Sequence, residues 1–312
     1  MSRLAAISVD LDSLQHYCRI QGLPESTLSS EANELVASKA IPRFLELFAQ
    51  ARVPATFFVI GSDLGSEQLV AALKRSHQAG VELANHSFSH DYALSRRSTS
   101  EIEADLLQCE TQLKTKVGVT PVGFRAPGYT LSAPMLEAVV ARGYAYDSST
   151  FPAAPYYLAK ASVMSALQVL GRPSRAVLDS PKVLLAPRVP YRPSLSNPYQ
   201  RGTAPLVELP MAVSPLARVP FIGTFATSMP WLLVESTFRR LRHDQLFNFE
   251  LHAVDVLDVS DGIAPELAAQ QRDLRVPVKQ KLERLSRVFS WLAEDRDAVT
   301  LQQAAQRLEP AL

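Results

Sequence analysis

The chain has 312 residues, 47% of them hydrophobic, which is enough to bury a large core within one domain. Its 32 basic and 31 acidic residues almost balance, and this near-neutral charge argues against a nucleic-acid-binding protein. Cys18 and Cys109 lie far apart and form neither a C-x-x-C pair nor a zinc-finger spacing, which favours two reduced thiols.

Short β-rich apolar runs alternate with segments of helical periodicity along the chain. The strands that we expect are 4–9, 55–60, 81–83, 122–124, 144–146, 206–213, 246–251 and 299–301. The main helices that we expect are 34–51, 67–79, 100–116, 133–142 and 276–294. This alternation predicts parallel βαβ units and an α/β fold, namely a distorted or incomplete (β/α) barrel of about seven parallel strands. A doubly wound open sheet is the alternative.

Residues 152–207 break this rhythm. They hold nine of the 22 prolines, and they hold seven basic residues against one acidic residue, Asp179. Pro155 and Gly171 bracket a helical pattern within this stretch, because proline suits the first turn of a helix and glycine suits its end. We therefore predict a single domain, 1–312, with an irregular, basic, proline-rich insertion at about 152–207.

The N-terminal segment predicts a cytoplasmic protein. A signal peptide needs an apolar region of about 7–15 residues, but here a polar stretch begins by Asp10. No apolar run approaches the roughly 18 residues that a transmembrane helix requires. Peripheral contact with the inner membrane face is left open.

Polar residues follow the expected strands at the ends where (β/α) barrels place their active sites. Asp10 and Asp12 follow the first strand, on one side of an extended chain, although a helix cap or a turn would also explain them. His86 and His90 follow the third strand, and their i, i+4 spacing predicts that both lie on one face of a helical turn and reach one metal ion.

The later strands add four more candidates. Arg125 opens the segment Arg-Ala-Pro-Gly after the fourth strand, and Tyr129 follows this segment. Asp147 follows the fifth strand and His252 follows the seventh. Chance assembly of carboxylates, a histidine pair, an arginine and a further histidine at successive strand ends is improbable, so the set predicts one active site.

With these motifs the chain resembles the polysaccharide deacetylases of carbohydrate esterase family 4, the NodB-homology family. The resemblance spans about 4–252 and rests on His-Ser-Phe-Ser-His at 86–90, for H-[S/T]-x-x-H, and Arg-Ala-Pro-Gly at 125–128, for R-x-P-x-G. It implies a distorted barrel and one divalent metal ion, often zinc, held by Asp12, His86 and His90.

The resemblance also implies a role for each remaining candidate. Asp10 would be the general base, and Arg125 would pair with it and keep it ionised. The backbone N–H of Tyr129 would stabilise the oxyanion. His252 would be the general acid, with Asp147 as the partner of that histidine.

Three departures from the family pattern concern the substrate. Leu11 separates the two aspartates, and this D-x-D form resembles branches that act on substrates other than chitin-like polymers, including a lipid-linked aminoarabinose deformylase. Phe151 stands where a tryptophan is usual. Glu250 stands where an aliphatic residue is usual, either as a substrate ligand or as a partner of His252.

The resemblance implies a hydrolase of linear amides that removes an N-acyl group, acetyl or formyl, from an amino sugar. We expect the basic insertion to form a cationic lip that receives an anionic or lipid-linked sugar, and the alternative is that its helix packs on the barrel and its basic residues are only solvated. Two other functions are weighed: a hydrolase of cyclic amides or ureides on the same fold, and a non-catalytic sugar-binding protein.

Overall fold

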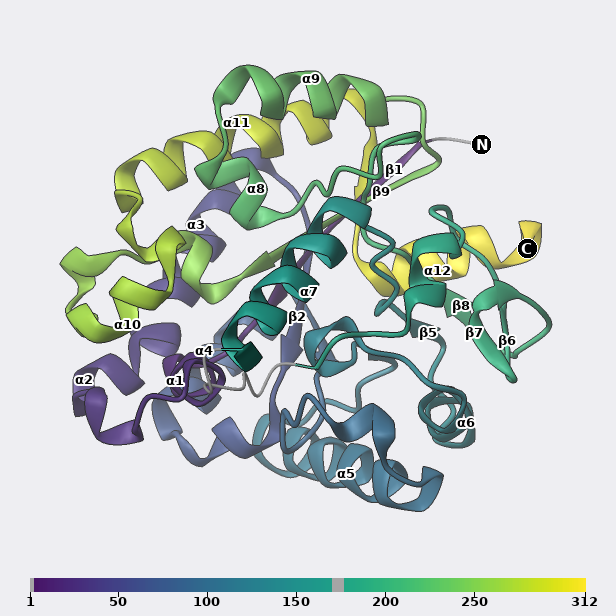
Figure 1. The fold of residues 1–312 in the computed structure, drawn as a ribbon, viewed down its shortest axis with the longest axis horizontal. Coiled ribbons are helices and arrows are strands. Elements are labelled where there is room, and N and C mark those ends of the chain that lie inside the picture. Colours follow the sequence, from purple (N-terminus) through teal and green to yellow (C-terminus); the bar gives the residue numbers. More distant parts are fainter. Residues whose placement is uncertain (1–2, 170–176) are drawn as a thin grey trace.

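The computed structural model describes residues 3–169 and 177–312, and its centre is one parallel sheet (Figure 1). The sheet order is β10-β1-β2-β3-β4-β5-β8. β10 and β2 share one edge of β1, and β9 pairs with its opposite edge. The strands are β1 Leu4–Asp10, β2 Ala55–Val59, β3 Glu82–Asn85, β4 Gly123–Phe124, β5 Tyr146–Asp147, β8 Val207–Glu208, β9 Leu246–His252 and β10 Asp297–Val299. All their pairings are parallel, and the sheet curls into an incomplete barrel, which confirms the predicted fold class.

Strand β1 is the centre of the sheet because it pairs with three strands. Its residues Leu4–Asp10 are in register with Leu246–His252 of β9 along their whole length. On the opposite edge, β10 pairs with the first half of β1, and β2 pairs with the second half. β1 is buried along its whole length, which explains why it reads as a continuous apolar run before Asp10.

The barrel is not closed by a regular ladder between β8 and β9. The predicted strand 206–213 contains only two residues of regular strand, and the chain then turns toward β9. The Ala212 N–H donates to the Asn248 carbonyl (3.0 Å), and the Asn248 side-chain amide donates to the Leu209 carbonyl (2.8 Å). A side chain therefore completes the pairing that backbone alone leaves open.

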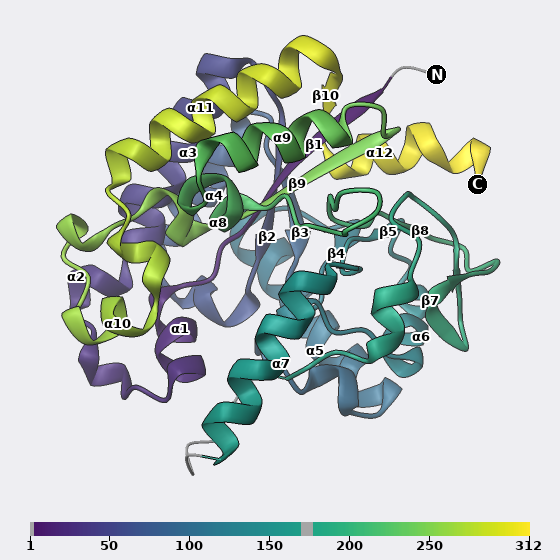
Figure 2. The ribbon, with the colours of Figure 1, turned by 45° about the horizontal axis from the view of Figure 1, so that its top comes forward.

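Helices cover the outside of the sheet (Figure 2). They are α1 Leu14–Gln21, α2 Ser30–Asn33, α3 Ile41–Ala51, α4 Glu67–Gln78, α5 Thr99–Gln112, α6 Ala133–Ala141, α7 Ala154–Val169, α8 Gly223–Ser228, α9 Trp231–Leu241, α10 Pro265–Gln270, α11 Val278–Asp295 and α12 Leu301–Leu308. A side-chain hydroxyl caps the first turn of α4, α5, α6 and α12, which fixes where each helix begins. Phe48 of α3 packs against Phe289 of α11 at 5.7 Å between ring centroids.

The stretch 152–207 is more ordered than predicted. It contains α7, a short 3-10 turn and the two-stranded hairpin β6 Pro193–Ser194 with β7 Asn197–Arg201. Arg188 pairs with Asp244 at 2.7 Å and Arg192 pairs with Glu309 at 2.9 Å, so these two basic residues bind the rest of the domain. Arg172 and Arg175, which the predicted cationic lip needs, lie outside the described residues. None of the described helices is long and apolar enough to cross a bilayer.

Candidate active site

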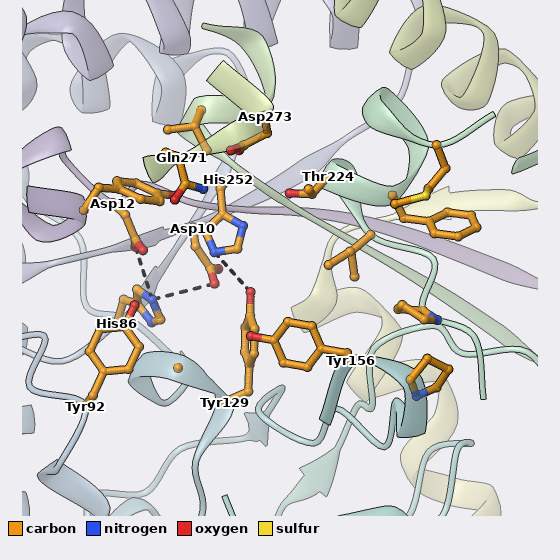
Figure 3. Close-up of a pocket in the computed structure, with 18 of the residues that line it drawn as sticks. Asp10, Asp12, His86, Tyr92, Tyr129, Tyr156, Thr224, His252, Gln271 and Asp273 are labelled. Atoms are coloured by element: carbon orange, nitrogen blue, oxygen red, sulfur yellow. Dashed lines mark hydrogen bonds and ion pairs between the residues drawn. The ribbon is translucent and has the colours of Figure 1, made fainter. Parts of the chain in front are cut away.

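Five of the predicted site residues line one cavity of about 550 Å³ at the carboxyl ends of the strands (Figure 3). Asp10 and Asp12 follow β1, His86 follows β3, Tyr129 follows β4, and His252 ends β9. Because parallel strands bring their carboxyl ends to one edge, residues far apart in the chain meet here. The structure thus brings these five residues together at the strand ends, and their catalytic and metal-binding roles stay predictions.

Asp12, His86 and His90 form the candidate metal centre. Their ligand atoms lie within 4.8 Å of one another, and all three residues are buried. The Asp12 Oδ1 atom lies 3.5 Å from His86 Nε2 and 3.4 Å from His90 Nε2. Neither Asp12 Oδ1 nor His90 Nε2 has a hydrogen-bond partner. Buried polar atoms are rarely left unpaired, so convergent unpaired atoms of this kind fit a divalent cation.

The protonation states of His90 and Asp12 suit a metal centre as well. Burial lowers the pKa of His86, but the Asp10 and Asp12 carboxylates outweigh burial and raise it. The His86 Nδ1–H donates to the Arg125 carbonyl at 2.8 Å, which leaves Nε2 free to face the other ligands. Burial lowers the pKa of His90 well below its ordinary range, so this imidazole is neutral. Burial opposes ionisation of Asp12, but His90 and His86 outweigh it and lower the pKa of Asp12. A neutral imidazole and an ionised carboxylate are the forms that bind metal.

The two histidines do not lie on a helical turn, so the geometric reason given for their spacing is wrong. Residues 86–90 form an irregular loop in which Ser87 and His90 have positive φ angles of 66° and 51°. Side chains hold the loop: the Asp105 carboxylate accepts the N–H groups of Phe88 (2.7 Å) and Ser89 (3.0 Å). The Ser87 hydroxyl accepts the His90 N–H at 2.9 Å. This scaffold, and not helical periodicity, points both imidazoles at Asp12.

Asp10 is held by a fully buried arginine, as predicted. Arg125 Nη1 donates to Asp10 Oδ1 at 2.6 Å, while its other nitrogens donate to the Ser8 hydroxyl (2.9 Å) and the Ser148 carbonyl (2.8 Å). The second carboxylate oxygen, Asp10 Oδ2, has no hydrogen-bond partner and lies 3.7 Å from His86 Nε2. Burial raises the pKa of Asp10 and Arg125 only partly offsets that rise, so Asp10 is a stronger base than an exposed aspartate.

The partner of His252 is Glu250 and not Asp147. His252 Nδ1 lies 2.9 Å from Glu250 Oε1, and Glu250 is fully buried. Burial lowers the pKa of His252, but the Glu250 carboxylate outweighs that effect and raises it well above its ordinary value. Alternation along β9 places residues 250 and 252 on one side of the strand, so the local sequence itself favours Glu250 as the partner of His252.

Asp147 instead belongs to a buried cluster behind the Arg125 loop. It accepts the Ser149 hydroxyl at 2.6 Å, and the same hydroxyl oxygen accepts the Ala126 N–H at 2.8 Å. Burial, with the adjacent Asp147 carboxylate, raises the pKa of Glu208 well above its ordinary value, so Glu208 is protonated more readily than an exposed glutamate. Asp147 thus fixes the loop that contains Arg125 and does not touch His252.

Tyr129 enters the site through its side chain and not through its backbone. Its N–H, predicted to stabilise an oxyanion, already donates to the Ala126 carbonyl at 3.1 Å. Its hydroxyl lies 3.1 Å from His252 Nε2. Burial raises the pKa of Tyr129 well above its ordinary value, so the phenol stays neutral. Tyr129 is therefore placed to exchange a hydrogen bond with the ring nitrogen that faces the cavity.

His16, in α1, is a further neighbour of the site. It is 3% exposed, and its ring meets the His90 ring edge-on at 4.6 Å between centroids. Its Nε2 lies 3.0 Å from Asp63 Oδ1. The motif spacing gave no signal for this contact, because α1 reaches His90 only through the tertiary fold.

Glu250→Gln is expected to lower the pKa of His252, because the isosteric amide removes the adjacent negative charge. The wild-type pair favours the folded state at low pH, and this contribution is lost as pH rises through the raised folded-state pKa of His252. An NMR titration of the His252 ring, at one fixed metal state, measures the change. Glu235→Gln breaks an exposed pair with Arg239 and should leave that titration unchanged. An equal pKa in the Glu250→Gln variant and the wild type would contradict the assignment.

Comparison with known proteins agrees with this geometry. Residues 32–146 match the family described as polysaccharide deacetylase. The peptidoglycan deacetylase of Helicobacter pylori is 29% identical over 157 residues, which are 50% of this chain and 53% of that protein. The chain thus spans about half the length of this curated relative.

Two solved structures share the fold over nearly the whole chain. A Mycobacterium smegmatis protein assigned to the polysaccharide deacetylases has a TM-score of 0.65 and 16% identity, and the match covers 99% of this chain and 91% of that one. The Puue allantoinase has a TM-score of 0.58 and 14% identity, with the same coverage. At such identities the likeness concerns the fold alone. Residues 32–146 thus match the polysaccharide deacetylase family, and the motifs at 86–90 and 125–128 lie within that match.

Proposed function

We propose that the protein is a metal-dependent amidase that removes an N-acetyl or N-formyl group from an amino sugar. The observation that supports this most directly is the presence of two proton-transfer groups with different surroundings in one cavity. Asp10 is a carboxylate with one unpaired oxygen, and His252 is an imidazole with a raised pKa. Both line this cavity beside the candidate metal centre, and each offers an atom within 4.8 Å of the other. Opposed environments of this kind separate a general base from a general acid.

Asp12, His86 and His90 would hold the divalent cation, for which we propose zinc. When bound, the cation supplies Lewis-acid polarisation of the substrate carbonyl and acidifies water near it. Asp10 Oδ2 accepts a proton from the attacking water while Arg125 fixes the orientation of the carboxylate.

His252 acts on the leaving group. A new C–O bond forms at the acyl carbon, the C–N bond breaks, and Nε2 of His252 delivers a proton to the departing nitrogen. Glu250 keeps the imidazolium charged and oriented through Nδ1. The Tyr129 hydroxyl occupies the hydrogen bond of Nε2 in the free protein, so the substrate nitrogen displaces this phenol on binding.

The test is a substrate panel incubated with metal-loaded protein: N-acetylglucosamine oligomers, an N-formyl amino sugar and a cyclic ureide. We expect the carboxylic acid and the free amine to form in equal amounts from the sugars, as followed by mass spectrometry. Ring opening of the ureide without sugar hydrolysis would establish the alternative amidase function. Sugar binding without any hydrolysis would establish a non-catalytic sugar-binding protein.

The prediction that the substrate is anionic is tested in the same way with a phosphate-bearing N-acyl sugar. A cytoplasmic location and contact with a membrane surface stay predictions. They require fractionation of cells and co-sedimentation with anionic liposomes.

A further inference from the structure

The cavity has two chemically different sides (Figure 3). One side holds Asp10, Asp12, His86 and His252. The segment between β8 and α9 supplies the other, which we call the apolar wall. Its members share an apolar side chain that lines the cavity: Val219, Pro220, Ile222, Phe225 and Met229. Thr224 is the one polar residue that this segment adds to the lining.

The position of the apolar wall is fixed by the fold. Phe225 packs on the buried Phe221 at 5.8 Å between ring centroids, and Phe225 itself is 8% exposed. Gly223 begins α8 directly against Asp255: a Cβ atom at Gly223 would lie 1.9 Å from Asp255 Oδ2. The same carboxylate accepts the His252 N–H at 2.8 Å. The Asp255 carboxylate thus contacts both the start of α8 in the apolar wall and the backbone of His252. This shared contact fixes the wall relative to His252.

Exposed apolar side chains continue from the lining residues outward. Met229, at the end of the wall, is 40% exposed, and Leu232, three residues further along, is 80% exposed. Pro155 and Tyr156 of α7 also line the cavity, and Leu158 on the same helix is 61% exposed. Large apolar side chains in water are unfavourable, and exposed apolar residues on the two segments that line the cavity, such as Met229, fit a surface that binds an apolar ligand.

A sugar alone does not match this wall. Its hydroxyl groups need hydrogen-bond partners when they leave water, and the apolar wall itself provides none. A phosphate group does not match it either, because no arginine or lysine lines the cavity among the described residues. A hydrocarbon group matches the apolar wall, because burying apolar surface against this wall makes the free energy of binding more favourable.

We propose that the substrate bears a hydrocarbon group, which binds along the apolar wall while the N-acyl bond lies at the metal centre. This inference rests on the proposed deacylase function and narrows its substrate class to amphipathic amino sugars. The hydrocarbon is either a longer N-acyl chain or an alkyl aglycone, and both present the same chemistry to Val219, Phe225 and Met229.

Two substrate series separate these sources. One series lengthens the aglycone of N-acetylglucosamine from methyl to octyl, and the other lengthens the N-acyl group from acetyl to octanoyl, all below the micellar concentration. We expect kcat/KM to rise at least ~10-fold along one series, because each buried methylene adds to binding. A flat response along both series, with measurable hydrolysis of the methyl and acetyl compounds, would overturn the proposal and leave the deacylase function standing.

Met229→Gln tests the wall itself, because it keeps the side-chain length at a 40% exposed position and adds polarity. We expect the octyl-to-methyl (or octanoyl-to-acetyl) ratio of kcat/KM to fall at least ~5-fold, while Met229→Leu keeps it. Leu185→Gln introduces the same amide at an 85% exposed position that does not line the cavity, and it should keep the wild-type ratio. An unchanged ratio in Met229→Gln, or an equal fall in Leu185→Gln, would contradict the assignment of the wall.

Calorimetry with octyl glucoside, which has no amide, gives a readout that needs no turnover. We expect it to bind the metal-loaded protein at least ~10-fold more tightly than methyl glucoside does, and to lose this advantage in Met229→Gln. Such binding without hydrolysis of any amide would refute the deacylase function and leave the hydrocarbon site in place. Equal affinity for the two glucosides would count against the hydrocarbon site.

Discussion

Replacing His86 and His90 together by alanine is expected to remove the bound metal and to reduce turnover by on the order of 10³-fold or more. The two imidazoles are two of the three ligands of the proposed centre, and Lewis-acid catalysis contributes several kcal/mol to such reactions. Metal content after chelation and reloading should fall from one equivalent per chain to nearly none. Added metal should also cease to raise the melting temperature, since only the folded wild type binds it.

The matched control removes two exposed histidines, His77 and His243. Their double alanine variant has the same composition as the test variant, and it should keep both the metal and the activity. Full metal stoichiometry in the His86→Ala, His90→Ala variant would eliminate Asp12, His86 and His90 as the ligand set.

Asp10→Asn should reduce turnover about 10²–10⁴-fold while the metal stays bound, because this change removes a proton acceptor and not a ligand. It should also destabilise the fold by roughly 3 kcal/mol, since the fully buried Arg125 loses its charged partner. Metal analysis and urea unfolding measure the two effects separately. Asp12→Asn is the comparison: it should lose the metal as well. If Asp10→Asn loses the metal and Asp12→Asn keeps it, the roles of the two aspartates are exchanged.

Much of the site could be predicted because its residues follow strands. Strand ends such as those of β1, β3 and β9 are readable from apolar runs, and parallel strands bring those ends together whatever the intervening loops do. The ligand set needed no knowledge of loop geometry. The helical turn that we expected from the spacing of the two histidines was wrong. The loop depends on positive φ angles at Ser87 and His90 and on contacts with Asp105, and the histidine spacing shows neither.

The errors share one physical cause, which is competition between partners. Asp147 and Glu250 are both acidic residues near strand ends. Alternation along β9 already favours Glu250 as the partner of His252, but the buried contacts of Asp147 depend on the tertiary fold. The Tyr129 N–H donates to the Ala126 carbonyl within a local turn, which the sequence pattern did not predict. Helix α8 reads as Gly-Thr-Phe-Ala-Thr-Ser, a weak helix former, and it forms because packing beside Asp255 overrides propensity.

The triple pairing of β1 determines the order in which the molecule can assemble. Leu4 pairs with Leu246 and with Asp297, so the central strand finds two of its three partners only in the last quarter of the chain. Such non-local contacts slow folding, because the entropy cost of closing the long loop comes before the stabilisation that strand pairing provides. During synthesis the backbone N–H and C=O groups of β1 that pair with β9 and β10 therefore have no strand partner at first. Asp10 approaches His252 only after β9 has left the ribosome. The pairing of β1 with β9 and the approach of Asp10 to His252 are therefore the same event.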